Sequence, residues 1–392
     1  MRRERRMNGD QDRASFGEAA PRQENIENNP MQSSRMTDTS VPLTHLTASA
    51  DPTFSPQRPI MPPSIRPATL RDLPEIVALL TQAALERRSL DPLLWRLAAD
   101  AQTRVERAVG AALERTEARA RELWLIAERS SRIVGVTHAI LVSVPPIYDG
   151  AEGPPGLLLD DCFASADAPP GTDEALLVAT EAALRSAGAS SLIASCPAAG
   201  PLHGLYESHG YEPVTLYMAK HRLSPNAVPL TARQAGAEDV PGIVRLSAEH
   251  RRTLAEVNPR FWHIHPEADR RFDAWMRHSL TLKDRDMFVA PVAAEVHGYI
   301  IAQPCSPLLV PIAHEIAAIG VIDDFYDEDF ANVSALTNSG SSGEDLLAAA
   351  ENAFARRAVD SAIVVCPAAW PSKVSLLERK GYRTAKLWMV RR

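Results

Sequence analysis

Two pairs of adjacent aspartates are the residues best suited to chemistry in this chain. Asp160-Asp161 and Asp323-Asp324 each follow a short apolar run and precede an aromatic residue within two positions. A carboxylate can remove a proton from an attacking group, and a phenol such as that of Tyr206 can return one. Because successive side chains of a strand point to opposite faces, at most one acid of each pair faces a substrate. A capping role for these acids, and simple ring packing for Tyr206, remain open.

The aspartates recur because the chain repeats itself. Residues 191–201 read SLIASCPAAGP and residues 361–371 read SAIVVCPAAWP, an offset of 361 − 191 = 170 positions. A Gly-Tyr pair and an aromatic-Met pair follow each run at an offset of 171. Similarity at so long a period indicates duplication of a whole domain. We therefore expect domains at 64–223 and 230–392, joined by a linker at 224–229 that carries two prolines.

The composition excludes several classes of protein. Hydrophobic residues make up 45% and charged residues 23% of the chain, which is ordinary for soluble globular domains. The net charge of −7 argues against a nucleic-acid-binding surface. No apolar run approaches the ~18 residues of a membrane span. The four cysteines lack metal-binding spacing and fit a reducing cytosol, so we expect a cytoplasmic protein.

The first 63 residues differ from the rest of the chain. They are rich in Asn, Gln, Ser, Pro and charge, and they show no sustained hydrophobic period. We predict that residues 1–63 form a disordered tail. An arm that binds a partner through its arginines is the alternative.

Each copy predicts the same order of elements. In the first copy we expect an extended start at Ile65-Arg66, helices at 73–85 and 92–118, and strands at 123–128, 133–144 and 157–163. A helix at 174–188, a strand at 191–196, a helix at 201–209 and one or two strands at 211–223 follow. The second copy predicts strands at 287–294, 297–303 and 315–325 and a helix at 344–357. The fold class is therefore α+β, or mixed α/β, with helices on both faces of a central sheet.

Three segments, in order and in both copies, resemble the GNAT N-acetyltransferase superfamily. RPATLRDLPEIVALL resembles the opening strand and helix of that family. LDDCFA and IDDFYD resemble its acidic-acidic-aromatic fourth strand, and LYESHGY resembles the end of its last helix. The resemblance implies two tandem GNAT-like domains, each a mostly antiparallel sheet with a parallel, splayed strand pair flanked by helices.

The resemblance also implies acetyl-CoA as cosubstrate, a primary amine of a small molecule or a protein as acceptor, and no metal. In the family an acid of the fourth strand can act as base, which points to Asp160 and Asp323. A tyrosine at the position of Tyr206 protonates the departing thiolate. Backbone N–H groups at a glycine-rich helix start hold the pyrophosphate. The matching positions are Gly171, Thr172, Asn338, Gly340, Ser341, Ser342 and Gly343.

Both copies depart from the family pattern. In the first copy Asp173 replaces the second loop glycine, and in the second copy Ser341 replaces the first one and Leu377 stands in place of Tyr206. We expect one active and one degenerate copy, with the first copy as the better candidate and the second as the alternative. A non-catalytic protein that binds acyl-CoA or a partner is the alternative from another class. Either a monomer or a homodimer is expected.

Two further groups of residues have side chains that could act in catalysis or bind a metal. Cys196 and Cys366 end apolar strands without a local histidine, so we predict buried small side chains rather than nucleophiles. His263 and His265 share one face if their segment is a strand, which would suit a metal. Because a second ligand pair is absent from the surrounding sequence, we instead expect this stretch to line the acceptor pocket of the second copy.

Overall fold

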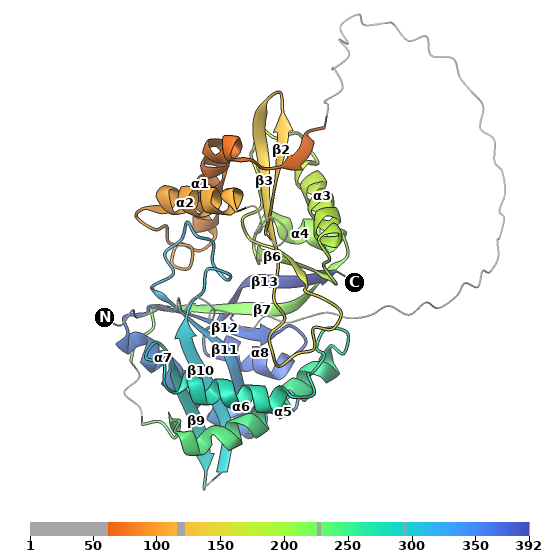
Figure 1. The fold of residues 1–392 in the computed structure, drawn as a ribbon. Helices are drawn as coiled ribbons and strands as arrows, with labels where there is room; N and C mark the ends of the chain where they lie inside the picture. The colour runs from red at the N-terminus through yellow and green to blue at the C-terminus, as the bar shows by residue number, and fades with distance from the viewer. Residues whose placement is uncertain (1–61, 116–121, 226–228, 294, 392) are drawn as a thin grey trace, which may run out of the picture.

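Figure 1 shows the protein as a computed structural model that describes residues 62–115, 122–225, 229–293 and 295–391. Nearly all of the tail predicted at 1–63, and residues 226–228 of the predicted linker, lie outside the described residues. The first copy contains β1 (Ser64–Pro67), α1 (Leu73–Leu90), α2 (Ala101–Glu114), β2 (Glu122–Arg129), β3 (Arg132–Leu141), β4 (Gly156–Leu158), β5 (Phe163–Ala164), α3 (Thr172–Ser186), β6 (Leu192–Pro197), α4 (Pro201–Ser208) and β7 (Tyr211–His221). The second contains β8 (Arg233–Gln234), α5 (Val240–Val257), α6 (Ala268–Ser279), β9 (Asp286–Val292), β10 (Glu295–Pro304), β11 (Ile319–Asp327), α7 (Ser341–Arg356), β12 (Ser361–Pro367), α8 (Pro371–Arg379) and β13 (Arg383–Arg391).

The sheets of the two copies form one continuous sheet. Its strand order is β1-β2-β3-β4-β6-β13-β7-β12-β11-β10-β9-β8, with β5 beside β3. The last strand of each copy has therefore crossed to the other copy. Strand β13 pairs antiparallel with β6, and β7 pairs antiparallel with β12. In Figure 1 the blue strand β13 accordingly lies beside the green strand β6.

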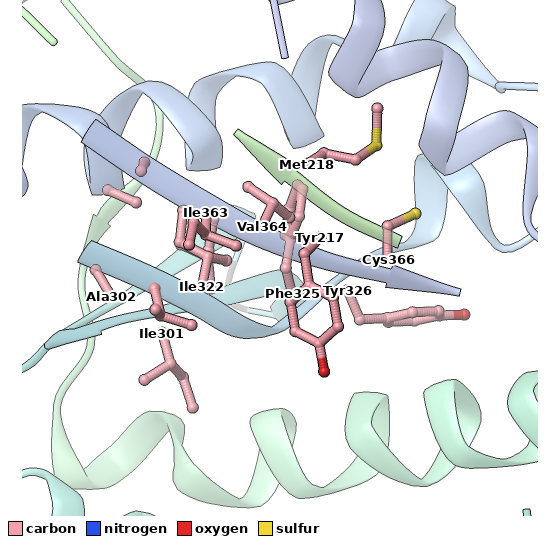
Figure 2. Packing of buried hydrophobic residues seen from close by; sticks show 14 of the residues in the cluster. Tyr217, Met218, Ile301, Ala302, Ile322, Phe325, Tyr326, Ile363, Val364 and Cys366 are labelled. Carbon is pink, nitrogen blue, oxygen red and sulfur yellow. The ribbon is translucent and has the colours of Figure 1, made fainter. Parts of the chain in front are cut away.

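The exchanged strands join the two cores. Tyr217 and Met218 of β7 are buried together with Ile322, Phe325 and Val364 of the second copy, all with 3% exposure or less. Figure 2 shows these side chains packed along neighbouring strands that come from different copies. Burying such apolar side chains contributes about 1.5–3 kcal/mol each relative to an exposed position. The centre of the sheet is thus a joint hydrophobic core rather than a surface contact between two domains.

The duplication is also visible where each copy begins. Arg66 donates two hydrogen bonds of 2.8 Å to Asp72, and Arg233 donates two of 2.7 Å to Asp239. In both copies the same carboxylate accepts the backbone N–H three residues before it. The Arg66 guanidinium lowers the pKa of Asp72 to about 2. These two bidentate arginine–aspartate pairs fix the first strand of each copy against its first helix in the same way.

The predicted order of elements holds, but some boundaries were wrong. Helix α1 runs to Leu90 instead of residue 85, and of the described residues 92–115 of the long predicted second helix only 101–114 are in an α-helix. The strand expected at 157–163 divides into β4 and β5, because its pairing with β6 ends at Leu158. Helices pack on both faces of the sheet, α1 and α3 on β3, and α5 and α7 on β10.

Candidate functional site: two strand gaps

Each copy contains a pair of parallel strands that separate. Strands β4 and β6 pair from Gly156–Leu192 to Leu158–Ala194, and β6 then continues to Pro197. Strands β11 and β12 pair from Ile319–Ser361 to Ile322–Val364, and both then continue. We call the separation beyond Leu158 the first gap and that beyond Ile322 the second gap. Asp160 lies two residues past its last pair and Asp323 one residue past, which agrees with the predicted splayed strands.

In the first gap both oxygens of Asp160 are engaged. The Nζ of Lys386 lies 2.6 Å from Oδ2, and both side chains are almost fully buried. The hydroxyl of Ser195 donates a hydrogen bond of 3.0 Å to Oδ1. Lys386 belongs to β13, so the second copy supplies this cation through the exchanged strand. Asp160 must therefore give up a partner before it can accept a proton from a substrate.

A narrow apolar pocket, of about 260 Å³ with the solvent at its mouth included, lies on the α3 and α4 side of the first gap. Tyr206 of α4 and Cys162 line it with side chains of β3, β4 and α3. Burial raises the pKa of Tyr206 well above its ordinary value, so the phenol stays protonated and can donate. Burial also raises the pKa of Cys162 to about 11, which disfavours the nucleophilic thiolate. Cys196 and Cys366 are fully buried, as predicted.

Helix α3 begins at the mouth of this pocket. Gly171 adopts φ +82°, and a Cβ built there would meet no atom of the described chain within 4 Å. No described side chain caps the helix start. The hydroxyl of Thr172 is used locally, donating 2.6 Å to the carbonyl of Pro169. Of the two residues predicted to hold phosphate in this copy, Gly171 leaves open space and the hydroxyl of Thr172 is engaged. Asp173, which replaces a glycine of the family pattern, lines the pocket with a carboxylate.

The opposite side of the first gap is covered by residues 305–318 of the second copy. His314 donates from Nδ1 to the carbonyl of Trp95 at 3.0 Å, and Arg87 donates to its Nε2 at 3.1 Å. Burial lowers the pKa of His314 to about 4, which keeps the ring neutral. Lys386 also donates to the carbonyl of Leu309 at 2.7 Å. This segment therefore packs against Lys386, the partner of Asp160, and against the first copy at Trp95.

The second gap opens into a cleft of about 650 Å³, solvent at its mouth included. The lining residues come from α5, α6, β11, β12, α8 and one loop of the first copy: Ile147, Tyr148, Ser247, His250, Arg251, Leu254, Phe272, Trp275, Asp323, Asp324, Val365, Pro367 and Lys373. Gln303 donates 2.6 Å to Oδ2 of Asp323, while Oδ1 is buried without a partner among the described residues. Burial, with the charge of Asp324, raises the pKa of Asp323 to about 7. A carboxyl with that pKa suits proton transfer at neutral pH.

The repeat explains why the two aspartates differ. The counterpart of Ser195 is Val365, at an offset of 365 − 195 = 170, and that of Lys386 is Thr215, at 386 − 215 = 171. The pairing agrees, because Lys386 lies opposite Pro197 and Thr215 opposite Pro367. The second gap therefore lacks both partners that hold Asp160.

Past the point where β11 and β12 separate, Trp370 and Lys373 are buried, and Lys373 also lines the cleft. Trp370 is fully buried, and its Nε1 donates 2.8 Å to the carbonyl of Phe330. Lys373 is also buried and donates 2.6 Å to the carbonyl of Phe325, past the point where the strands separate. The counterpart of Trp370 is Gly200, at an offset of 170. The first copy thus has a glycine where the second has a buried indole.

The predicted phosphate cradle of the second copy binds carboxylates of its own chain. Asp329 accepts from the backbone N–H of Ser342 and from the amide of Asn338, both at 3.0 Å, and Asp327 accepts from the hydroxyl of Ser342 at 2.7 Å. Burial raises the pKa of Asp327 to about 6.

The remaining cradle residues are Gly340, Ser341 and Gly343. A Cβ at Gly340 or Gly343 would lie 3.0 Å from Leu376, so both glycines pack closely. Ser341 follows Gly340 as the exposed first residue of α7. A helix start that already binds its own acids is a poor site for a further anion.

The histidines at 263 and 265 are placed differently from the prediction. Neither lines the cleft; their backbones bond the loop of the first copy, at Asp149 and Ile147. Within the described ranges, no group of three or more His, Cys, Asp or Glu residues could hold a metal ion. Nor does any described helix have the length and hydropathy to cross a membrane. Sequence reasoning missed Lys386 and Trp370, although the Gly200/Trp370 difference inside a matching run was a visible signal.

Comparison with known proteins supports this architecture. No protein-family model and no curated protein matches the chain. Among solved structures, a GCN5-related N-acetyltransferase from Sphaerobacter thermophilus matches with 16% identity and a TM-score of 0.50, covering 84% of this chain and 95% of that one. The chain has the GNAT fold. A tandem GNAT protein from the clavulanic acid biosynthesis pathway also matches, with 12% identity and a TM-score of 0.45, over 83% and 97% of the two chains.

Proposed function

We propose that the protein is an acyl-CoA-dependent N-acyltransferase that binds its acyl donor in the first gap and transfers an acetyl group to a primary amine. One observation carries the proposal. The first gap keeps an apolar pocket beside the open start of α3, whereas the second copy has the buried Trp370 at the position of Gly200. An acyl-CoA bound there supplies an activated thioester.

The residues of the first gap fit such a donor in most respects. The apolar walls suit an extended aliphatic arm, and the backbone N–H groups beyond Gly171 suit a pyrophosphate. Asp173 counts against the fit, because its carboxylate lies in the first turn of the same helix. No cationic residue lines this pocket within the described chain. We therefore expect weak donor binding rather than none.

Three side chains of the first gap have distinct roles in this proposal. The phenol of Tyr206 stays protonated and would supply a proton to a departing thiolate. The carboxylate of Asp160 would accept the proton that an ammonium group must lose before it attacks. Lys386 positions that carboxylate, and it must yield Oδ2 for Asp160 to act as a base.

A second candidate function is binding of acyl-CoA without transfer. It is favoured by the partners that hold both oxygens of Asp160 and by the segment 305–318 that packs against Lys386. Transfer in the second gap is a weaker possibility. Asp323 would be a suitable base there, but the second copy has the buried Trp370 at the position of Gly200.

Calorimetric titration of acetyl-CoA tests where the donor binds. We expect Gly200→Trp, which introduces the indole that the second copy carries at this position, to weaken binding by at least about 100-fold. Gly200→Ala is the matched control and should bind as the wild type does. Unchanged affinity in Gly200→Trp would place the donor elsewhere.

Release of free CoA with a panel of primary amines separates the two candidate functions. Turnover by the wild type that falls at least about 100-fold in Tyr206→Phe supports transfer in the first gap. Binding that is lost in Gly200→Trp, without turnover on any amine, supports the non-catalytic function. A cytoplasmic location agrees with the four cysteines being free thiols, and it belongs to the same proposal, as does a monomeric or homodimeric state.

A further inference from the structure

The pocket of the first gap has an apolar interior whose few polar groups are already engaged. Its apolar lining comes from β3, β4, β5, α3 and α4: Val136, Leu158, Phe163, Leu176, Leu177, Leu202 and Leu205. The thiol of Cys162 donates to the carbonyl of Leu159 at 3.1 Å and lies 3.0 Å from the hydroxyl oxygen of Thr137. Among the described residues that line the pocket, Asp173 has the only side chain of a charged type. Such walls suit an uncharged aliphatic chain.

The helix start at the mouth of this pocket carries acids instead of cations. Asp173 and Glu174 both lie in the first turn of α3. The nearby basic groups are used by other acids, since Nε2 of His209 lies 3.6 Å from Glu174 and Arg132 lies 3.5 Å from Asp167. Burial raises the pKa of Asp173, and no basic side chain of the described chain opposes that shift. The positive end of the helix dipole is therefore already compensated by the helix's own carboxylates.

The second copy lacks a free anion site for a different reason. At the start of α7, Asp329 accepts from the backbone N–H of Ser342 and Asp327 accepts from its hydroxyl. Both copies nevertheless keep the pair of parallel strands that separates. The strand gap and the anion site are thus independent features, and in both copies acids stand where phosphate would bind.

These charges bear differently on the two parts of coenzyme A. Its pantetheine arm, which carries the thioester, is uncharged. Its nucleotide carries a pyrophosphate and a further phosphate, with several negative charges at neutral pH. Repulsion by Asp173 and Glu174 offsets the hydrogen bonds that backbone N–H groups beyond Gly171 can offer to those phosphates. The arm meets no such repulsion inside the apolar pocket.

We propose that the first gap recognises its acyl donor by the uncharged pantetheine arm, and that the nucleotide of coenzyme A contributes little to the affinity. The inference rests on the function proposed above, because it concerns the same pocket. The substrate class is accordingly the acyl thioesters of pantetheine, with or without the nucleotide. It is the same for acyl transfer and for binding without transfer.

The test compares acetyl-CoA with acetyl-pantetheine, which lacks the nucleotide, by calorimetry on the full chain. We expect the two dissociation constants to agree within about tenfold. Raising the NaCl concentration from about 0.05 M to about 0.5 M should leave the affinity for acetyl-CoA unchanged or tighten it, because salt screens the repulsion by the acids. A site that attracts the phosphates would show the opposite dependence.

Three variants locate the effect. Asp173→Asn should raise the affinity for acetyl-CoA relative to acetyl-pantetheine by about two- to fivefold, because the removed charge repels the phosphates. Glu114→Gln removes one charge at the exposed end of α2 and should leave this ratio unchanged. Gly200→Trp should weaken both thioesters by at least about 100-fold, which assigns both to the first gap. Circular dichroism confirms that Gly200→Trp is folded.

The outcomes separate this inference from the proposed function. A preference of more than about tenfold for acetyl-CoA, or an affinity for it that falls with salt, overturns the inference and leaves the proposed function intact. A ratio that Asp173→Asn leaves unchanged overturns the charge argument on which the inference depends. Binding of neither thioester, or unchanged binding of both by Gly200→Trp, instead overturns the proposed function, and this inference with it.

Discussion

The two strand gaps arose by duplication, and each now retains open space on a different side of its separating strands. The first gap retains space on the side of α3 and α4, and its acid is paired with Lys386 under a covering segment. The second gap retains space on the side of α5 and α6, and its acid has a pKa of about 7. The gaps differ at three repeated positions, where the first gap has Gly200, Ser195 and Lys386 and the second has Trp370, Val365 and Thr215. After duplication, each copy could lose the open space on one side of its gap, because the other copy retained the space on that side.

The largest expected effect follows from removing the indole that is buried at the second gap. Trp370→Ala should lower the free energy of unfolding by about 4–5 kcal/mol, because the buried cavity cannot collapse fully. Urea titration measures the change, and Trp370→Phe, which keeps a ring, should lose clearly less. The stoichiometry of acetyl-CoA binding should stay at one, since Asp329 still caps α7. A second bound equivalent would show that the indole alone separates the two gaps.

The next effect concerns the ion pair that crosses between the copies. Lys386→Met should destabilise the fold by about 3–4 kcal/mol, because it leaves the carboxylate of Asp160 buried without its cation. The double variant Lys386→Met/Asp160→Asn should recover most of this loss. Chemical denaturation of both variants checks the expectation. If the double variant were no more stable than the single one, packing rather than charge would explain the role of Lys386.

A pH-dependent effect distinguishes the second acid from the first. The folded chain holds the proton of Asp323 up to about pH 7, whereas the ordinary value is 3.8. Since the folded state then binds more protons, this group makes the fold less stable as pH rises between those values. Asp324 and burial cause the shift, and Arg285 and Gln303 oppose it. Asp323→Asn should therefore be more stable than the wild type at pH 8, by about 1–2 kcal/mol.

The control for this expectation is the same pair of proteins at pH 5. There the wild-type carboxyl is largely protonated when folded, so the two stabilities should approach each other. Urea titration at both values gives the comparison. A difference independent of pH would mean that Asp323 ionises as an ordinary surface acid does.

The smallest effect sharpens the assignment of the donor to the first gap. Asp173→Asn removes a negative charge from the first turn of α3 and should tighten acetyl-CoA binding about two- to fivefold. The same change removes a favourable helix-dipole interaction and should cost at most about 0.5 kcal/mol of stability. Glu114→Gln, on the exposed end of α2, is the control. Equal affinity in all three proteins would place the pyrophosphate away from α3.

The sequence predicted the architecture of each copy because periodicity and repeated motifs are local properties. The position of Asp160 and Asp323 at the point of strand separation was predicted, as was the burial of Cys196 and Cys366. The exchange of strands β7 and β13 between the two copies was not predicted. Both strands have the same apolar pattern, so either can pair with β6 or with β12 without changing which face is buried.

The partners of the acids depend on that exchange and could not be read from the chain either. Lys386 lies 226 positions from Asp160, since 386 − 160 = 226. Similarly, the loop at Tyr148 and the segment at His314 reach the other copy only once the common sheet has formed. The buried indole of the second copy was accessible in principle, because Trp370 interrupts a run that otherwise matches the first copy closely.

Strand β13, at Arg383–Arg391, has a consequence for how the protein is made. It is made after every other strand of the sheet, yet it lies between β6 and β7 in the middle of that sheet. A nascent chain that has completed the first half therefore has no native neighbour for the edge of β6. The native sheet can form only after β13 has been made, and until then that unpaired edge is open to chaperones or to another nascent chain.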